Sequence, residues 1–201
     1  MILRRQFLII AAASALTLAV RPVWADSPDQ AASFIKQTGD RLVGVVNGPG
    51  SPPGKRAQMT QILNDAVDVD GIAKFCLGRF WRTATPGQQQ EYVRLFHEVL
   101  VTNITSKLGE YQGVAFTMGK AHTQGDEDVV STTVTRPNNP PTAVDWIVAQ
   151  IGGKAKIIDV VAEGTSLRLT QRQDYASYLM HNNNSVDALI SAMKNQVGQA
   201  G

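Results

Sequence analysis

The stretch that decides the fold is residues 142–175, TAVDWIVAQIGGKAKIIDVVAEGTSLRLTQRQDY. Its first two parts, 142–151 and 154–163, are rich in Val and Ile, which is typical of β-strands. Only Gly152-Gly153 separates them, and so short a connection forces the two strands to run antiparallel. After Gly164 the pattern becomes helical, over about 171–181. The stretch is therefore a strand hairpin that leads into a helix.

The residues before and after this stretch extend both parts of the pattern. Strands are predicted at 113–120 and 128–135, with turns at Gly125-Asp126 and at 137–140 (Pro-Asn-Asn-Pro). A last helix is predicted over 185–197. The sheet should therefore have four antiparallel strands, with helices following it.

Helical patterns fill the chain before the sheet. A capping box at 27–30, Ser-Pro-Asp-Gln, opens a helix that should end near Asn47. A second helix carries Met59 and Ile62, and a short third one runs from about Asp70 toward Gly78. Another box at 85–88 opens what should be the longest helix, ending at Gly109. The chain is predicted to be one α+β domain, with a twisted four-stranded antiparallel sheet packed on one face by several helices.

The first 25 residues form a predicted export signal. Arg4 and Arg5 precede an apolar run from Phe7 to Val20, and Val23-Trp24-Ala25 places small residues before a cut at Asp26. The run is too short to span a bilayer, and no cysteine follows the cut to take a lipid anchor. The Arg-Arg-Gln-Phe-Leu order is similar to a twin-arginine signal, and an ordinary Sec signal fits as well. The domains are thus 1–25, a cleaved signal, and 26–201, an exported soluble domain.

Charge and cysteine content exclude several function classes. The whole chain carries a net charge of +2, but removal of residues 1–25 leaves 16 basic against 17 acidic residues, or −1. A near-neutral chain lacks the basic surface expected of a nucleic-acid-binding protein. Cys76 is the only cysteine, so an intramolecular disulfide and a cysteine zinc site are excluded, and we expect a buried structural thiol.

Residues suited to catalysis are few. His97, His122 and His181 are scattered, and the sequence contains no phosphate loop, zinc-protease motif or serine-hydrolase elbow. The remaining candidates are strand carboxylates, because small isomerases of similar architecture place a general base inside a sheet. They are Asp145, Asp159 and Glu163.

Strict alternation along the last strand helps to judge these carboxylates. It puts Asp159 and Glu163 on one face with Ile157 and Val161, and Ile158, Val160 and Ala162 on the other. Acids that share a face with apolar residues suit an ion pair with Arg168 or Arg172 as well as they suit an isomerase or hydrolase. We therefore predict no catalytic residue and keep the enzyme as the alternative.

Large apolar residues suggest a ligand pocket. Helices that stand off a curved sheet leave an apolar space in which small-molecule sites of this kind lie, although ordinary core packing also explains such residues. Seven residues are predicted to line this pocket because of the size of their side chains and the direction in which these should point: Phe75, Phe80, Phe96, Leu100, Val144, Trp146 and Val160.

Several motifs together resemble one known family. Residues 70–75 (DGIAKF) are followed by Leu-Gly-Arg at 77–79 and by Trp81, then Thr-Pro at 85–86 and a Gln run. Asp-Val at 159–160, Glu-Gly at 163–164, Ser166 and Gln-Arg at 171–172 follow in order. In this order they resemble the MlaC family, also called the toluene-tolerance or auxiliary ABC-transport family, over nearly all of the mature chain. A branch of that family is associated with hopanoid biosynthesis.

The resemblance implies a function. Members are periplasmic proteins that hold phospholipid tails between sheet and helices, and they shuttle lipid between an outer-membrane complex and an inner-membrane ABC transporter. It implies a phospholipid or hopanoid ligand, those two membrane complexes as partners, and no cofactor, metal or nucleic acid. A monomer is the expected state. An adaptor that docks on the transporter without ligand is a third hypothesis, which predicts a filled core.

Overall fold

The computed structural model describes residues 28–106 and 108–199, so the predicted export signal lies outside the described residues. Up to Thr105 the described chain forms five helical segments, of which the four α-helices follow the expected order. Capping chemistry explains their starts: Ser51 accepts from Gly54 N, Asp68 from Gly71 N, and Thr85 and Gln88 form the predicted reciprocal box. The segments are α1 (Pro28–Asn47), α2 (Pro52–Ala66), α3 (Val69–Leu77), the 3₁₀ turn η1 (Gly78–Arg82) and α4 (Pro86–Thr105).

Two expectations about α4 are wrong in detail. The helix ends at Thr105, and a separate 3₁₀ turn, η2 (Leu108–Tyr111), occupies the expected last turn. Helix α4 has 20 residues, as many as α1, so the two are equally long. At the end of α4, the Thr105 hydroxyl donates to the carbonyl of Val101 at 2.8 Å, a local side-chain bond that competes with helix continuation.

The sheet is an antiparallel meander with the order β1-β2-β3-β4-β5. Its strands are β1 (Ala115–Gln124), β2 (Glu127–Thr135), β3 (Thr142–Ile151), β4 (Lys154–Ala162) and β5 (Thr165–Ser166). The α+β class and the single antiparallel sheet are confirmed, but the sheet has five strands rather than four. The fifth was missed because it is only two residues long and pairs back on β4 through a tight turn, in which Glu163 and Gly164 both have positive φ (51° and 80°).

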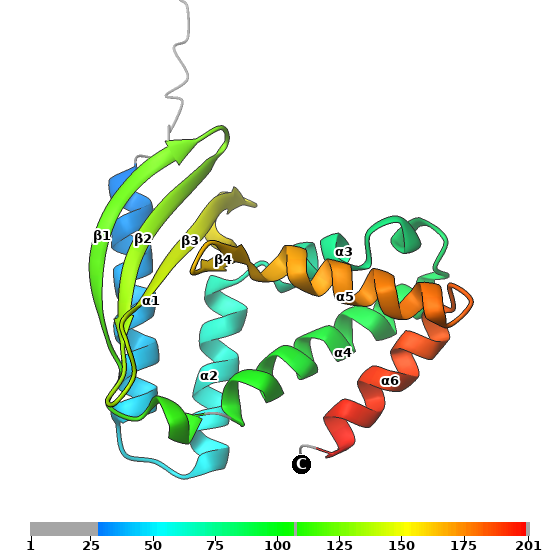
Figure 1. Cartoon of the computed structure of the whole chain (residues 1–201), viewed down its shortest axis with the longest axis horizontal. Helices are drawn as coiled ribbons and strands as arrows, with labels where there is room; N and C mark the ends of the chain where they lie inside the picture. Colours follow the sequence, from blue (N-terminus) through cyan, green and yellow to red (C-terminus); the bar gives the residue numbers. More distant parts are fainter. Residues whose placement is uncertain (1–27, 107, 200–201) are drawn as a thin grey trace, which may run out of the picture.

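Two helices follow the sheet, α5 (Leu167–His181) and α6 (Val186–Gln199). Helix α5 begins four residues before the expected position, directly after β5. Ser166 is the reason, since its hydroxyl accepts from Leu169 N at 3.1 Å and caps the first turn. Figure 1 shows the resulting layout: the sheet with α1 on one side of the molecule, α3 to α6 on the other, and α2 between them.

A bulge in β4 overturns the predicted strict alternation. Val148 pairs with Ile157, whereas Ile147 pairs with Asp159, so β4 has one extra residue at this point. Because directly paired residues share a face, Ile157 lies with Val160, on the face opposite to Asp159. The bulge therefore places Asp159 and Ile157 on opposite faces of the sheet.

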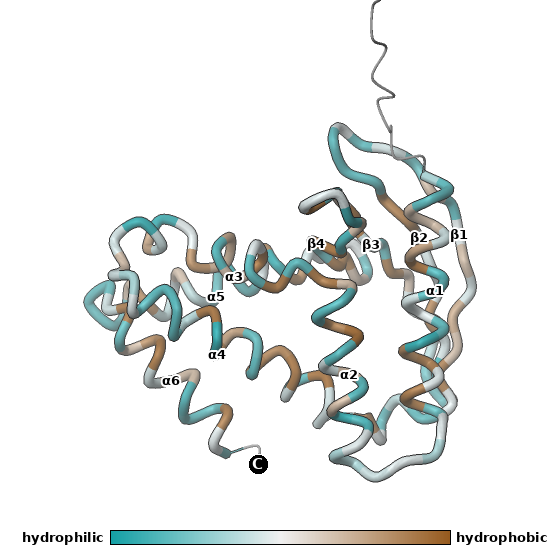
Figure 2. The backbone as a smooth tube through the Cα atoms, turned by 180° about the vertical axis from the view of Figure 1, so that it is seen from behind, coloured by the Kyte–Doolittle hydropathy of each residue, from teal (hydrophilic) through white to brown (hydrophobic). Residues whose placement is uncertain are grey.

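The apolar interior is divided into three clusters. The first, here the helical cluster, joins α3, η1, α4, α5 and α6 around Tyr92. The second joins the end of α1 to α2 and α4, and the third, here the sheet cluster, packs α1 on the sheet around Val130. Figure 2 shows hydrophobic residues recurring along α2 and α4 between hydrophilic ones, as expected for helices that bury one side. Among the described helices, none is long and apolar enough to cross a bilayer.

Candidate functional site

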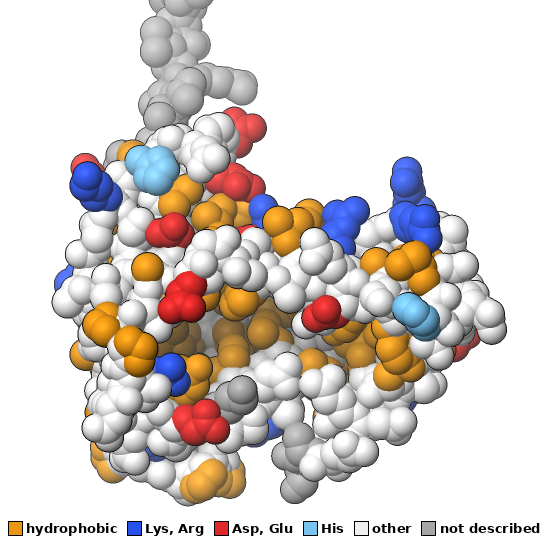
Figure 3. Space-filling model, in the orientation of Figure 1, with side chains coloured by type: hydrophobic (Ala, Val, Ile, Leu, Met, Phe, Trp, Pro, Cys, Tyr) orange, Lys and Arg blue, Asp and Glu red, His pale blue; other side chains and the backbone are white. Residues whose placement is uncertain are grey.

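A hollow lies between the two sides of the molecule. In Figure 3, which has the orientation of Figure 1, it opens over α2, between the sheet and α4, and hydrophobic side chains gather on its walls. The linker between α2 and α3 connects the apolar clusters, because its Val67 packs against all three of them. The next residue, Asp68, donates its backbone N–H to the carbonyl of Ile157 at 3.0 Å and so ties this linker to β4.

Four of the seven predicted pocket residues belong to the helical side. Phe80 and Phe96 are buried in the helical cluster, and Phe75 and Leu100 are partly buried against it. Phe96 also contacts the rings of Tyr92 and Tyr175, with centroids 6.0 and 6.3 Å away in tilted and edge-on arrangements. These residues lie in or against an aromatic core.

The other three lie on the sheet, on the face that carries the sheet cluster. Val144 is buried, and the cross-strand partners Trp146 and Val160 are partly buried. The Trp146 ring nitrogen donates to the Thr132 hydroxyl at 2.9 Å, which satisfies the polar end of this large side chain. The structure therefore places the seven residues in two groups rather than around one enclosed cavity, and their role in binding stays a prediction.

The cavities found in the described part of the chain lie elsewhere. One of about 60 Å³ is enclosed between the first turn of α1 and β2 to β4, and an open depression of about 370 Å³ follows the outer side of α1. Neither is lined by any of the seven residues. The enclosed one is far below the roughly 300–1,000 Å³ of a small-molecule pocket.

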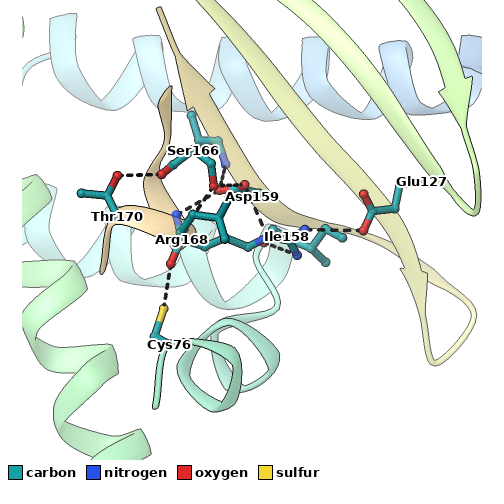
Figure 4. Close-up of polar contacts among 9 residues, drawn as sticks. Cys76, Glu127, Ile158, Asp159, Ser166, Arg168 and Thr170 are labelled. Carbon is teal, nitrogen blue, oxygen red and sulfur yellow. Dashed lines mark hydrogen bonds and ion pairs between the residues drawn. The ribbon is translucent and has the colours of Figure 1, made fainter. Parts of the chain in front are cut away.

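The junction that holds the sheet and the helices together is centred on Asp159 (Figure 4). Its carboxylate is 5% exposed and accepts hydrogen bonds from Val160 N at 2.8 Å, Arg168 N at 3.1 Å and the Ser166 hydroxyl at 2.6 Å. Such bonds offset the cost of burying a charge. Ser166 thus serves two elements, since it also caps α5.

Arg168 extends this junction in three directions. Its guanidinium lies 3.4 Å from Asp159 Oδ2 and 3.6 Å from Glu127 Oε1 on β2, and it stacks on Phe75 of α3 at 4.9 Å from the ring centroid. Its Nε is buried without a hydrogen-bond partner in the part of the chain that the structure describes, so charge and stacking hold it. One side chain therefore ties two strands to α3.

Arg172 and the neighbouring thiol complete the junction. Arg172 also stacks on the Phe75 ring, at 4.8 Å, and the thiol of Cys76 donates to the Arg168 carbonyl at 3.5 Å. Burial, reinforced by the Asp159 carboxylate, raises the pKa of this thiol from 9.0 to about 12. Cys76 is thus the buried structural thiol that the sequence predicted.

The three candidate bases lie in different surroundings. The expected pairing of an acid with Arg168 is confirmed for Asp159, whose oxygens are already occupied by the donors of the junction. Glu163 is exposed in the β4–β5 turn, and Asp145 lies partly buried on β3, opposite Val161 of β4. Among residues 28–106 and 108–199, no group of three or more His, Cys, Asp or Glu side chains could hold a metal ion.

Sequence reasoning missed two residues of this region. Val67 and Glu127 belong to segments far from residues 159–175, and neither is marked by a motif. Only the parallel bridge between Val67 and Ile157, and the ion pair from Glu127 to Arg168, reveal them. The DGIAKF and LGR motifs at 70–79 were the available signal that this region is special, because they contain Phe75 and Gly78, the two positions on which Arg172 rests.

Comparison with known proteins identifies the family. The family model described as MlaC protein matches residues 27–195, nearly the whole described chain. The chain belongs to the MlaC family.

One relative supports this assignment, and one solved structure has the same fold. Toluene tolerance protein ttg2D of Pseudomonas putida is 30% identical over 145 residues, covering 71% of this chain and 67% of that protein. A phospholipid-binding protein from Ralstonia solanacearum, solved in complex with a phospholipid, superposes with a TM-score of 0.73 over 85% of this chain and 98% of its own. At 21% identity the latter shows that the two proteins share a fold.

Proposed function

We propose that this MlaC family member is a periplasmic lipid carrier that receives the tails of a phospholipid in the hollow between the sheet and the helices. The observation that supports this most directly is the hollow itself, an apolar opening along the line where separately packed clusters meet. The same fold holds a phospholipid in the Ralstonia solanacearum protein. A hopanoid is the alternative cargo.

A carrier has a clear physical task. Exposing a diacyl lipid to water uncovers about 30 methylene groups at about 0.8 kcal/mol each, or roughly 24 kcal/mol, so spontaneous transfer between bilayers is very slow. A pocket that opens along a seam can shelter these tails and release them when a partner favours the empty state. The partners we propose are an outer-membrane lipid complex and the substrate-binding subunit of an inner-membrane ABC transporter.

The family assignment and the occupied oxygens of Asp159 favour a binding protein over an enzyme. The decisive experiment is native mass spectrometry of the protein purified from the periplasm of a Gram-negative host, followed by lipid extraction. We expect about one phospholipid or hopanoid per chain. A lipid-free mass that stays unchanged after incubation with vesicles would overturn the proposal and favour the adaptor.

Matched variants locate the site. Leu100→Arg and Val160→Asp place a charge against the helical cluster and the sheet cluster, the two groups of proposed pocket residues, and should abolish lipid retention, because a buried charge beside the tails is costly. The controls Leu167→Arg and Ile151→Asp make the same changes at side chains that are 51% and 43% exposed, and should leave retention unchanged. Folded variants at 100 and 160 that still hold lipid would remove these residues from the site.

A further inference from the structure

A group of cations lies along α3, η1 and α5 on the helical side. Between Val69 and Arg82 three basic residues accompany one acidic residue, whereas residues 108–166, which contain the sheet, hold seven acidic and four basic residues. The protein is therefore strongly asymmetric in charge, although the chain after residue 25 is close to neutral. Figure 3 shows Lys and Arg side chains along the edge of the molecule formed by α3, η1 and α5, beside hydrophobic ones.

These cations lack acidic partners. Lys74, Arg79, Arg82 and Arg172 are all exposed, and within the described residues none forms an ion pair with a carboxylate. Three of them rest on aromatic rings instead: Lys74 on Trp81, Arg79 on Phe80 and Arg172 on Phe75, at 5.6, 4.9 and 4.8 Å from the ring centroids. Stacking positions the charges without neutralising them.

Exposed apolar side chains lie on the same side of α5 as Arg172. Leu169, Arg172, Ala176 and Met180 recur at three or four residues, so they share one side of the helix. Arg172 contacts Phe75 and packs over Gly78, which places this side next to α3 and η1. Leu169 and Met180 are 48% and 58% exposed.

The other sides of α5 make different contacts. The Tyr178 hydroxyl donates to the carbonyl of Ala188 on α6, and Asp174, two residues after Arg172, lies on the far side of the helix from it. The cations and the two apolar side chains therefore form one surface, the basic face, made of Lys74, Arg79, Arg82, Arg172, Leu169 and Met180.

We propose that the basic face binds the surface of a bilayer that contains anionic phospholipids. Each Lys or Arg near such a surface adds attraction, and exposed Leu and Met side chains between cations can insert at the boundary of headgroups and acyl chains. An anionic bilayer surface is the proposed partner because it matches this combination of unpaired positive charge and half-exposed apolar side chains. The inference concerns how the protein meets a membrane, and it does not depend on what fills the hollow.

The test uses the exported protein, beginning at Asp26, because the apolar run before it would itself enter vesicles. Vesicles of phosphatidylcholine alone are compared with vesicles containing phosphatidylglycerol in sedimentation at low salt. We expect binding only with phosphatidylglycerol, and loss of binding as the salt rises above about 0.15 M, where the screening length falls to about 8 Å. Lipid taken up by the unbound protein is measured separately by mass spectrometry, so failure of the carrier function is distinguishable.

Matched variants test the face itself. Arg79→Gln with Arg82→Gln should lower the partition coefficient about 30-fold, and Lys74→Gln with Arg82→Gln is the second pair should the first fail to fold. Lys120→Gln with Lys154→Gln removes the same charge from exposed strand positions and should change it less than twofold. Leu169→Ser should weaken binding about fivefold, and Leu167→Ser, at a similarly exposed leucine outside the face, should not.

Three results would overturn the proposal. One is equal binding to the two kinds of vesicle. Another is an equal loss in the two charge pairs, which would mean a general attraction rather than a face. The third is binding to an acidic partner protein, weakened by Arg79→Gln with Arg82→Gln, without any binding to vesicles.

Discussion

The helical cluster and the sheet cluster are packed in different ways. In the helical cluster Tyr92 has no exposed surface, its hydroxyl donates to the carbonyl of Ala73 at 2.9 Å, and its ring contacts those of Phe96 and Tyr175. In the sheet cluster Val130 is equally buried, but its neighbours Trp146 and Val160 remain partly exposed. One side is a closed aromatic core and the other is a surface with an open margin.

The difference teaches where the molecule can open. Each side keeps its own core. Val67, the Asp68 backbone and the Asp159–Arg168 junction link the two, and the second cluster joins α4 to α1 and α2. Local openings follow lines of few buried apolar contacts. We therefore expect separation along this seam rather than within either cluster, and four measurements examine that expectation.

The largest effect is expected in the helical cluster. Tyr92→Ala removes a fully buried ring and a satisfied hydrogen bond, and it should lower the free energy of unfolding by about 3–5 kcal/mol. Chemical denaturation followed by circular dichroism measures this loss. A loss below 1 kcal/mol would show that the helical side is not a tightly packed core.

A smaller effect is expected at the junction. Asp159→Ala leaves the Ser166 hydroxyl and the Arg168 backbone N–H without their acceptor and removes the carboxylate beside the buried Arg168 guanidinium, and it should cost about 2–3 kcal/mol. Asp145→Ala, on the same sheet face but with no side-chain hydrogen bond or ion pair to any residue that the structure describes, is the matched control and should cost less than 1 kcal/mol. Hydrogen exchange at the first turn of α5 should rise in the first variant alone. Equal costs for the two variants would contradict the assigned junction.

Cys76 gives a pH-dependent effect on the helical side. Since its pKa rises from 9.0 to about 12 on folding, the unfolded chain loses this proton first as the pH increases. Stability should therefore fall above pH 9, by about 1.4 kcal/mol per pH unit. Burial raises the pKa of Tyr92 and Tyr175 as well, so the measurement should stop at pH 10.

The matched variant is Cys76→Ala, which should remove most of this slope between pH 9 and 10. The wild-type thiol should also resist alkylation at neutral pH until the protein unfolds. Rapid alkylation of the folded protein would mean that α3 and α5 part more readily than the helical cluster implies.

The smallest effect is expected on the exposed surface of α4. Hydrogen bonds from Arg94 and Lys194 lower the pKa of Glu91 from 4.5 to about 2. Because the folded-state pKa is the lower one, the stabilisation is complete above pH 4.5 and is lost as the pH falls toward 2. Glu91→Gln should flatten this dependence slightly, and added salt should reduce it in the wild type. If neither Glu91→Gln nor added salt alters the pH dependence of stability, Glu91 is not the source of that dependence.

The sequence by itself determined the order of elements and the class of fold. The capping box at 85–88 and the glycine turns at 125 and 152–153 act over a few residues, so local rules located them. The family motifs at 70–79 and 159–172 also marked the two segments that form the junction.

Only the tertiary structure decided what those segments do. The β4 bulge moved Asp159 away from Ile157, the two-residue β5 placed Ser166 to serve both a strand and a helix, and Glu127 met Arg168 from across the sheet. The bulge and the Glu127–Arg168 contact depend on how neighbouring strands pair, and β5 is too short to show a period, so periodicity contains none of the three. The seven pocket candidates fall into two groups for a similar reason. Their positions along a helix or strand predict that the side chains turn inward, but only the packing of the elements decides which core each side chain joins.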